Sequence, residues 1–253
     1  MKKTGKKYLA LLIGAGILVF LGIFIQFSVA EFLSAIPEFF RFLFMDFLPP
    51  SLSQWKEYVQ PVLDTFYFSV IATFVSSVIS VILAFLAAGR ITALVPLKYL
   101  IKFIASVIRN IPVLVWASIL VLIFGIGTIP GVMSLIIFDI GFLIRSYSES
   151  LEEMEVNYQE ALKAQGISSL VRIVRGDLPM FLPSFYSWTL FIFEINIRAS
   201  AILGIVGAGG LGVQLKEATG MFRYHEAAVI IIVMVVMILG VEFLTNKVKE
   251  ALV

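Results

Sequence analysis

Cysteine is absent from this chain of 253 residues, and histidine occurs once, as His225. Without cysteine the chain has no disulfide, no thiolate nucleophile and no cysteine metal ligand, and a single histidine excludes a multi-histidine metal centre. Charged residues are also scarce, at 14% of the chain, whereas soluble proteins contain about 25%. These absences predict no metal site, and we assign no catalytic residue to this chain. Its formal net charge of +2, spread over scattered basic residues, does not predict nucleic-acid binding.

The chain contains long hydrophobic runs, and 60% of its residues are hydrophobic. Because a membrane-spanning helix needs about 20 predominantly apolar residues, these runs predict an all-α integral membrane protein with six transmembrane helices. The helices are expected at about 8–28, 62–88, 99–124, 129–147, 180–205 and 226–245. The first run exceeds the roughly 7–15 residues of a signal-peptide core, which predicts an uncleaved helix. Pro112 predicts a kink in the third span, since proline removes an intrahelical hydrogen bond.

An amphipathic segment separates the first two spans. Residues 31–50, EFLSAIPEFFRFLFMDFLPP, combine phenylalanines with charged side chains such as Glu38 and Arg41. This pattern is typical of a helix that lies in the membrane interface. We therefore divide the chain into an N-terminal helix with an interfacial segment, 1–60, and a membrane domain, 61–253.

The basic residues divide unevenly between the two sides of the membrane. With the N-terminus inside, thirteen of the nineteen lysines and arginines fall on the inner side and four on the outer side. Because lysine and arginine favour the cytoplasmic side, we predict that both termini are cytoplasmic. The remaining two basic residues, Arg109 and Arg198, lie within spans.

The longest inner connection, about 148–179, joins the fourth and fifth spans. Its first part has the apolar spacing of a helix, and Gly166 suits a helix end because glycine tolerates the left-handed conformation. These features alone allow a solvated loop with two surface helices. A more specific spacing is formed by Glu160, Ala161, Gly166, Leu178 and Pro179.

This spacing resembles the EAA loop of bacterial ABC-importer permeases, in which an E-A-A tripeptide is followed by a glycine and then by leucine and proline. The chain departs from that pattern at Leu162, where alanine is usual, and at Gly176, where an aliphatic residue is usual. In that family the loop forms a short helix that docks into a separate ATPase subunit. The resemblance implies that these five residues couple the chain to an ATPase. ATP and Mg²⁺ would be bound by that partner, and this chain has no cofactor and no G-x-x-x-x-G-K-[ST] loop.

The stretch 207–212, GAGGLG, matches the dinucleotide-binding pattern G-x-G-x-x-G and follows a strand-like apolar run. A dinucleotide fold needs a parallel sheet, but only 41 residues follow Gly212 and most of them form another span. We therefore reject a cofactor site and place the stretch at the outer end of the fifth span or in the loop beyond it. Two hypotheses remain for Gly207, Gly209, Gly210 and Gly212. They permit close helix packing and a turn, or they form a flexible outer gate.

Immediately upstream, the segment FEINIRAS places Glu194, Asn196 and Arg198 within the fifth span. An arginine at a helix centre costs roughly 2.5–3.5 kcal/mol on insertion scales, so it faces protein or water. Glu194 and Arg198 are four residues apart and can pair on one helix face, whereas Asn196 points about 160° away. Either this pair locks the helix to a neighbour, or Arg198 offers its planar donor fork to an anion. Arg109 and Asp139 are expected to pair across the third and fourth spans.

As a whole, the motifs E-x-N-x-R-A-S and L-G-x-V-G-A-G-G-x-G over residues 194–212 resemble the phosphonate ABC transporter permeases. The superfamily resemblance covers about residues 62–245. It implies a type I importer permease fold in a bacterial cytoplasmic membrane, and a permease for phosphonate, phosphite or phosphate. Besides the lipid bilayer, it implies three protein partners: an ATPase dimer, an extracytoplasmic phosphonate-binding protein and a second permease copy, identical or paralogous.

Two alternatives remain open from the sequence. One is a stand-alone secondary carrier or channel, which would not need a loop that couples to an ATPase. The other is a permease of the same superfamily for methionine or another small solute. The segment around Arg198 favours the phosphonate permeases over this second alternative.

Overall fold

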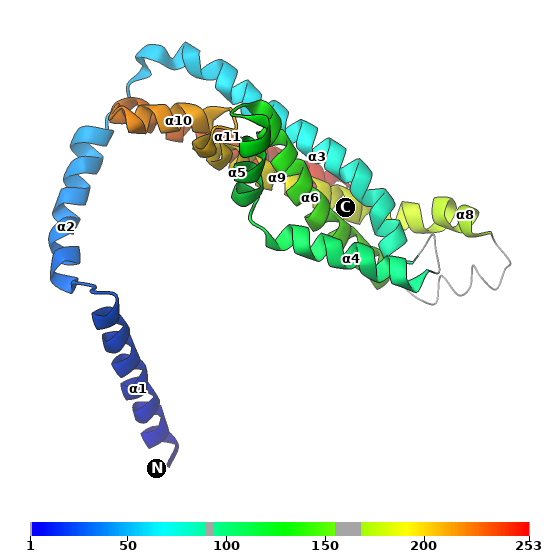
Figure 1. Cartoon of the computed structure of the whole chain (residues 1–253), viewed down its shortest axis with the longest axis horizontal. Coiled ribbons are helices and arrows are strands. Elements are labelled where there is room, and N and C mark those ends of the chain that lie inside the picture. Colours follow the sequence, from blue (N-terminus) through cyan, green and yellow to red (C-terminus); the bar gives the residue numbers. More distant parts are fainter. Residues whose placement is uncertain (1, 90–93, 155–167, 253) are drawn as a thin grey trace. The chain divides into compact units, whose positions relative to one another are not determined.

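The computed structural model describes residues 2–89, 94–154 and 168–252, and every regular element in those ranges is helical (Figure 1). The α-helices are α1 Lys2–Phe24, α2 Val29–Arg41, α3 Val59–Ala87, α4 Val95–Asn110, α5 Val113–Phe124, α6 Thr128–Glu153, α8 Ser169–Arg172, α9 Leu178–Leu203, α10 Leu211–Gly220 and α11 Tyr224–Leu252. Shorter 3₁₀- or π-helical turns are η1 Phe42–Phe47, η2 Leu52–Tyr58, η3 Ile173–Asp177 and η4 Gly204–Val206. Contacts divide the chain into two units, Met1–Pro49 and Pro50–Val253.

The first unit contains α1 and the amphipathic helix α2. The Ser28 hydroxyl caps α2 by accepting a hydrogen bond from the backbone N–H of Glu31 at 3.2 Å. An apolar groove along the helix is lined by Phe32, Ala35, Ile36, Phe39 and Phe40. The structure thus contains a helix in the segment expected to be amphipathic, and its location in the membrane interface stays a prediction.

Within the described ranges, four helical stretches are long and apolar enough to cross a membrane. They are Trp55–Ala87, Thr128–Glu153, Ile173–Val206 and Tyr224–Leu252. Two bent pairs bring the number to six if each pair forms one span, namely Leu11–Phe24 with Val29–Phe47, bent by 74°, and α4 with α5, bent by 88°. The predicted all-α membrane architecture is therefore confirmed, with two of the six candidate spans broken.

The third predicted span, 99–124, is two helices rather than one kinked helix. Ile111 has an extended backbone and Pro112 immediately precedes α5, because proline lacks an N–H and disfavours a helical backbone at the preceding residue. The Trp116 indole of α5 donates a hydrogen bond to the Ile108 carbonyl at 3.3 Å. The same carbonyl also accepts the Ile111 N–H at 3.3 Å, so the indole adds a second bond that joins α5 to the end of α4 across the bend.

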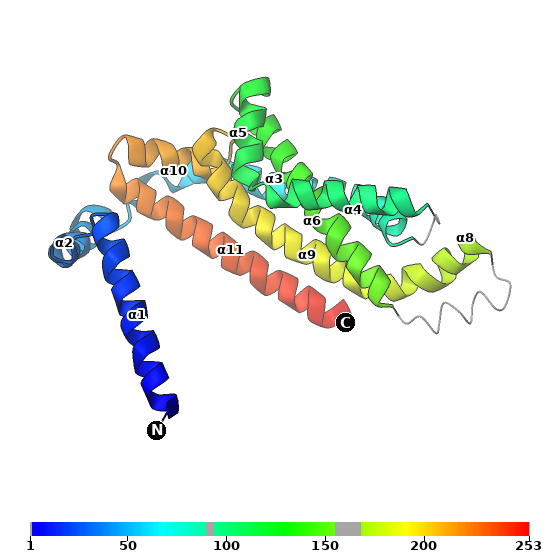
Figure 2. The ribbon, with the colours of Figure 1, turned by 60° about the horizontal axis from the view of Figure 1, so that its bottom comes forward.

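The core of the second unit forms where α3 packs against α6 and α9, with α11 packed on α9 (Figure 2). The buried face of α3 consists mostly of small residues, among them Ser69, Ala72, Ser76, Ser80 and Ala84. Small side chains let helix backbones approach each other closely. This close packing brings polar groups of three helices together inside the unit.

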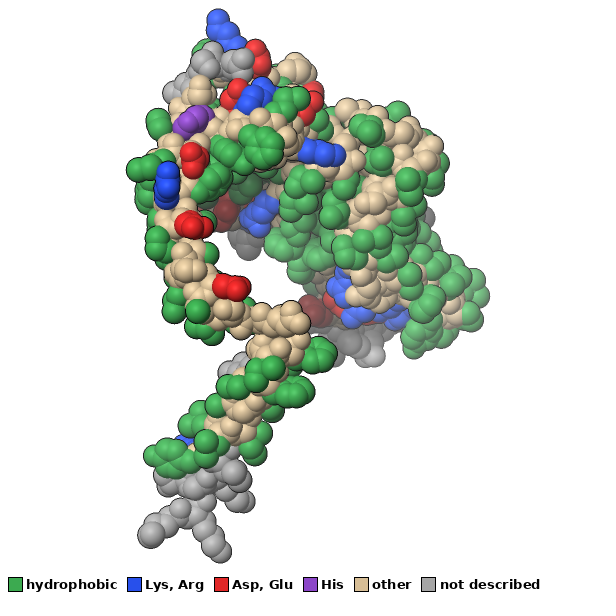
Figure 3. All heavy atoms as spheres, turned by 60° about the vertical axis from the view of Figure 1, so that its left-hand side comes forward, with side chains coloured by type: hydrophobic (Ala, Val, Ile, Leu, Met, Phe, Trp, Pro, Cys, Tyr) green, Lys and Arg blue, Asp and Glu red, His purple; other side chains and the backbone are tan. Residues whose placement is uncertain are grey.

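Hydrophobic side chains are spread widely over the face shown in Figure 3. Individual apolar residues are highly exposed, such as Leu122 at 87% and Ile126 at 81%. Large exposed apolar surfaces are unusual on soluble monomers. They are expected on helices that contact lipid or other membrane subunits.

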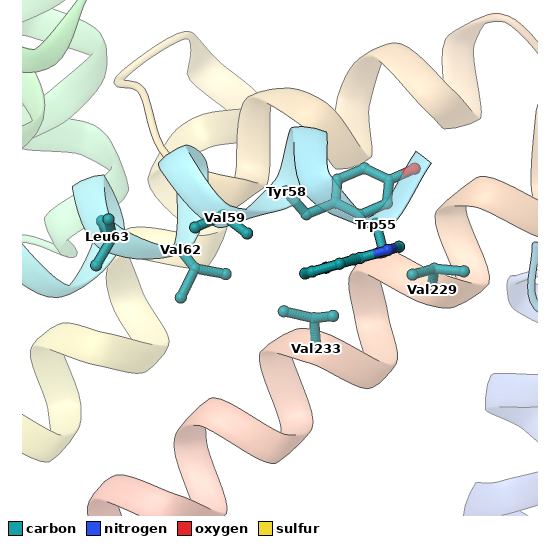
Figure 4. A pocket seen from close by; sticks show the side chains of 7 residues that line it. All are labelled: Trp55, Tyr58, Val59, Val62, Leu63, Val229 and Val233. Carbon is teal, nitrogen blue, oxygen red and sulfur yellow. The ribbon is translucent and has the colours of Figure 1, made fainter. Parts of the chain in front are cut away.

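A groove of about 260 Å³ lies between η2 with the start of α3 on one side and the start of α11 on the other (Figure 4). Its lining consists of Trp55, Tyr58, Val59, Val62, Leu63, Val229 and Val233. None of these side chains carries a charge at neutral pH. The groove therefore offers no countercharge for an anion, and the charged residues of α9 are better candidates for a functional site.

Candidate functional site

The three polar residues of the FEINIRAS segment lie on α9 but contact different helices. Asn196 is fully buried, and its amide donates hydrogen bonds to Asp139 Oδ2 of α6 at 2.6 Å and to Thr73 Oγ1 of α3 at 3.0 Å. The Ser76 hydroxyl also donates to Asp139 Oδ2, at 3.3 Å. The expected pairing of Asp139 with Arg109 is therefore wrong. Asn196 and Ser76, rather than Arg109, donate to Asp139, because α9 and α3 both pack against α6.

We expect Asn196→Leu to lower the free energy of unfolding by about 1–3 kcal/mol, because it leaves the buried Asp139 carboxyl without its principal donor. Thermal or denaturant unfolding in detergent measures the change. Ser200→Ala is the control, since within the described part of the chain the buried Ser200 hydroxyl bonds only the Ile197 carbonyl of its own helix. The double variant Asp139→Leu with Asn196→Leu should recover part of the loss, because it removes both polar partners. Equal losses in Asn196→Leu and Ser200→Ala would contradict this role.

The expected pair between Glu194 and Arg198 does not form. Glu194 accepts a hydrogen bond from Lys249 Nζ at 2.9 Å and another from the Thr245 hydroxyl. Arg198 Nη2 lies 3.6 Å from Glu242 Oε2. Each charged residue of α9 therefore pairs with α11, because that helix runs beside α9 and offers charges of both signs.

Sequence reasoning missed Thr245 and Lys249 as partners of Glu194. The available signal was their spacing: Glu242, Thr245 and Lys249 follow at intervals of three and four residues, which places them along one face of a helix. The two pairs differ in exposure. The side chains of Arg198 and Glu242 are 48% and 46% exposed, whereas those of Lys249 and Glu194 are 24% and 10% exposed.

Residues 207–210 form the turn between η4 and α10, and Leu211 and Gly212 begin α10. The strand-like run before the turn is helical, since it lies in α9 and η4. Gly207, Gly209 and Gly210 have φ angles of 89°, 91° and 70°, which side chains other than that of glycine rarely adopt. The Gly127 N–H donates to the Gly207 carbonyl at 2.9 Å, which ties this turn to the start of α6. The Thr65 hydroxyl accepts from the Leu211 N–H at 3.0 Å and so caps α10.

Gly212 lies in the first turn of α10, directly against the end of α9. A Cβ atom at this position would overlap the carbonyl oxygen of Ala201 and crowd the backbone of Gly204. This geometry agrees with the close-packing hypothesis for Gly212. Its role in an outer gate stays a prediction.

The predicted coupling residues are only partly described. Glu160, Ala161 and Gly166 lie outside the described residues. Leu178 and Pro179 are the first two residues of α9, where a proline is compatible with the helix start because its missing N–H needs no partner. The preceding segment consists of α8 and η3, and Gly176 within η3 is buried. The coupling assignment for all five residues stays a prediction.

Residues 80–252 match the family described as the binding-protein-dependent transport system inner membrane component. The chain belongs to this family. It is therefore a multi-pass membrane permease subunit, not an enzyme, and it works in a system that depends on a binding protein.

Several proteins of similar sequence are named as permeases for phosphorus compounds. The phosphite transport system permease protein of Stutzerimonas stutzeri is 30% identical over 204 residues, which are 80% of this chain and 74% of the relative. A phosphate-import permease protein of Mycolicibacterium smegmatis is also 30% identical, over 81% of this chain but only 38% of that protein.

The fold is similar to that of a solved ABC transporter. A chain of the inward-facing methionine transporter MetNI superposes with a TM-score of 0.71 at 20% identity, covering 80% of this chain and 99% of the other. This similarity confirms the predicted type I importer permease fold.

Proposed function

We propose that this chain is the transmembrane permease of an ABC importer that carries phosphonate, or the related oxyanions phosphite or phosphate, into a bacterial cell. The main support is the similarity to a phosphite permease over 80% of the chain. The motif around Glu194, Asn196 and Arg198 supports the same substrate class through its resemblance to phosphonate permeases.

In this proposal, Arg198 is the residue that binds the anion. Its side chain is half exposed, and its Nη2 atom lies 3.6 Å from Glu242 Oε2. A guanidinium presents several donors in a planar fork that fits the oxygens of a phosphorus oxyanion. An exposed arginine within a candidate span is costly in lipid, so it is better placed against a second subunit or a water-filled path.

The energy for transport comes from partners in this proposal. A separate ATPase dimer binds ATP and Mg²⁺ and docks on the inner loop, through Glu160, Ala161 and Gly166 together with Leu178 and Pro179. An extracytoplasmic binding protein delivers the anion. Because an ATPase dimer has two docking clefts and this chain has one such loop, a second permease copy completes the pathway. The glycine turn 207–212 would lie beside the entrance as its outer gate.

Uptake measurements on the complete transporter test the proposal. Cells that express this chain with its ATPase and binding protein should accumulate labelled 2-aminoethylphosphonate, phosphite or phosphate, and cells without this chain should not. Labelled methionine serves as the comparison, since one relative at 28% identity is named a probable D-methionine permease. Uptake of methionine without any of the three oxyanions would overturn the substrate assignment. Uptake without the ATPase would instead support a stand-alone carrier.

A further inference from the structure

Two salt bridges join α9 to α11, and their environments differ. Glu194 is held by two donors, Lys249 at 2.9 Å and the Thr245 hydroxyl, and only 10% of its side chain is exposed. Arg198 and Glu242 are separated by 3.6 Å, the longest distance among the salt bridges of the described residues, and both side chains are about half exposed. The first pair is a fixed structural contact, and the second is open to displacement.

In the exposed Arg198–Glu242 pair, the Glu242 carboxylate lies where a transported anion would bind. Glu242 and a phosphorus oxyanion would both use oxygen atoms to accept hydrogen bonds from the same guanidinium. In the water-filled path that the proposed function requires at Arg198, an exposed ion pair adds little to stability, because water solvates both charges when they separate. An anion can therefore displace the Glu242 carboxylate from Arg198 at small cost, whereas displacing Glu194 from Lys249 would expose a buried contact.

We infer that Glu242 is the counter-ion of Arg198, that it competes with the incoming anion, and that it thereby sets the affinity of the membrane site. This inference rests on the proposed function, because it requires that an anion reaches Arg198. Glu242 then has two effects. It neutralises Arg198 between transport events, and it keeps the anion from binding too tightly to be released.

Direct binding to the permease–ATPase complex tests this competition, with the binding protein left out so that its own affinity does not dominate. The probe is labelled 2-aminoethylphosphonate, measured by equilibrium dialysis in detergent. Glu242→Gln removes the competing charge but keeps the size of the side chain, and it should lower Kd by about two- to fivefold. Glu194→Gln is the matched control and should leave Kd unchanged, because its partner is Lys249. Glu242→Ala, which also removes the negative charge, should likewise lower Kd.

The outcomes separate this inference from the proposed function. If the unaltered complex binds and transports the oxyanion but Glu242→Gln and Glu242→Ala leave Kd unchanged or raise it, the counter-ion role is wrong and the proposed function stands. If Glu194→Gln lowers Kd as much as Glu242→Gln, the effect is a general change of charge, and the assignment to Glu242 fails. If the unaltered complex neither binds nor transports any of the three oxyanions, both fail together.

Discussion

Replacement of Arg198 by glutamine is expected to reduce oxyanion uptake at least about tenfold, which corresponds to a loss of about 1.4 kcal/mol or more of interaction with the anion. Glutamine retains a polar side chain but has neither the positive charge nor the forked donors of arginine. Arg198→Lys keeps the charge and loses the fork, so we expect an intermediate rate. Initial rates of labelled uptake, measured at equal amounts of transporter in the membrane, give the comparison.

The competing hypothesis is that Arg198 only locks α9 to its neighbour. The structure identifies the partner for a double-variant test as Glu242 rather than Glu194, because Glu242 is the carboxylate near the guanidinium. If Arg198 is a lock, Arg198→Gln combined with Glu242→Gln should restore uptake, since neither charge is left unpaired. If Arg198 contacts the anion, the double variant should stay inactive while it still co-purifies with the ATPase. Full uptake by the double variant would refute substrate contact.

The second large effect is expected from a side chain at Gly212. Gly212→Ala places its Cβ atom against the Ala201 carbonyl and the Gly204 backbone, neither of which can rotate away. Forcing extra atoms into a packed core typically lowers the free energy of unfolding by about 1–3 kcal/mol. Because the Cβ atom overlaps backbone atoms that cannot rotate away, we expect a loss of about 3 kcal/mol or more. We expect a lower melting temperature in detergent and a smaller yield of monodisperse protein.

Gly240→Ala is the matched control for this prediction. Gly240 lies within α11, and a Cβ atom there would meet nothing within 4 Å. Because alanine favours helix over glycine by about 1 kcal/mol, this variant should be as stable as the unaltered protein or more stable. Comparable destabilisation by the two substitutions would show that backbone packing at Gly212 is not the cause.

Some features were predictable because they depend on neighbouring residues in the chain. The apolar runs predicted the membrane helices, since each run needs only its own length and composition to span a bilayer. The clustered glycines of 207–212 predicted a turn or close packing after the fifth span. The amphipathic pattern of residues 31–50 predicted a helix, and α2 covers its first part. Even so, the effect of Pro112 was underestimated. Whether proline kinks a helix or breaks it depends on the contacts of the flanking helices, here including that of Trp116 with Ile108.

The sequence by itself determined the class of protein, the helical segments and the presence of polar residues within them. Only the tertiary structure decided which of those polar residues contact each other. Helical spacing made Glu194 and Arg198 a reasonable pair, yet both contact α11, because the antiparallel packing of α9 and α11 places Lys249 beside one and Glu242 beside the other. Asp139 likewise contacts Asn196 from a helix far along the chain. The register between two packed helices depends on the shape of their whole interface, and no local pattern in either helix contains that information.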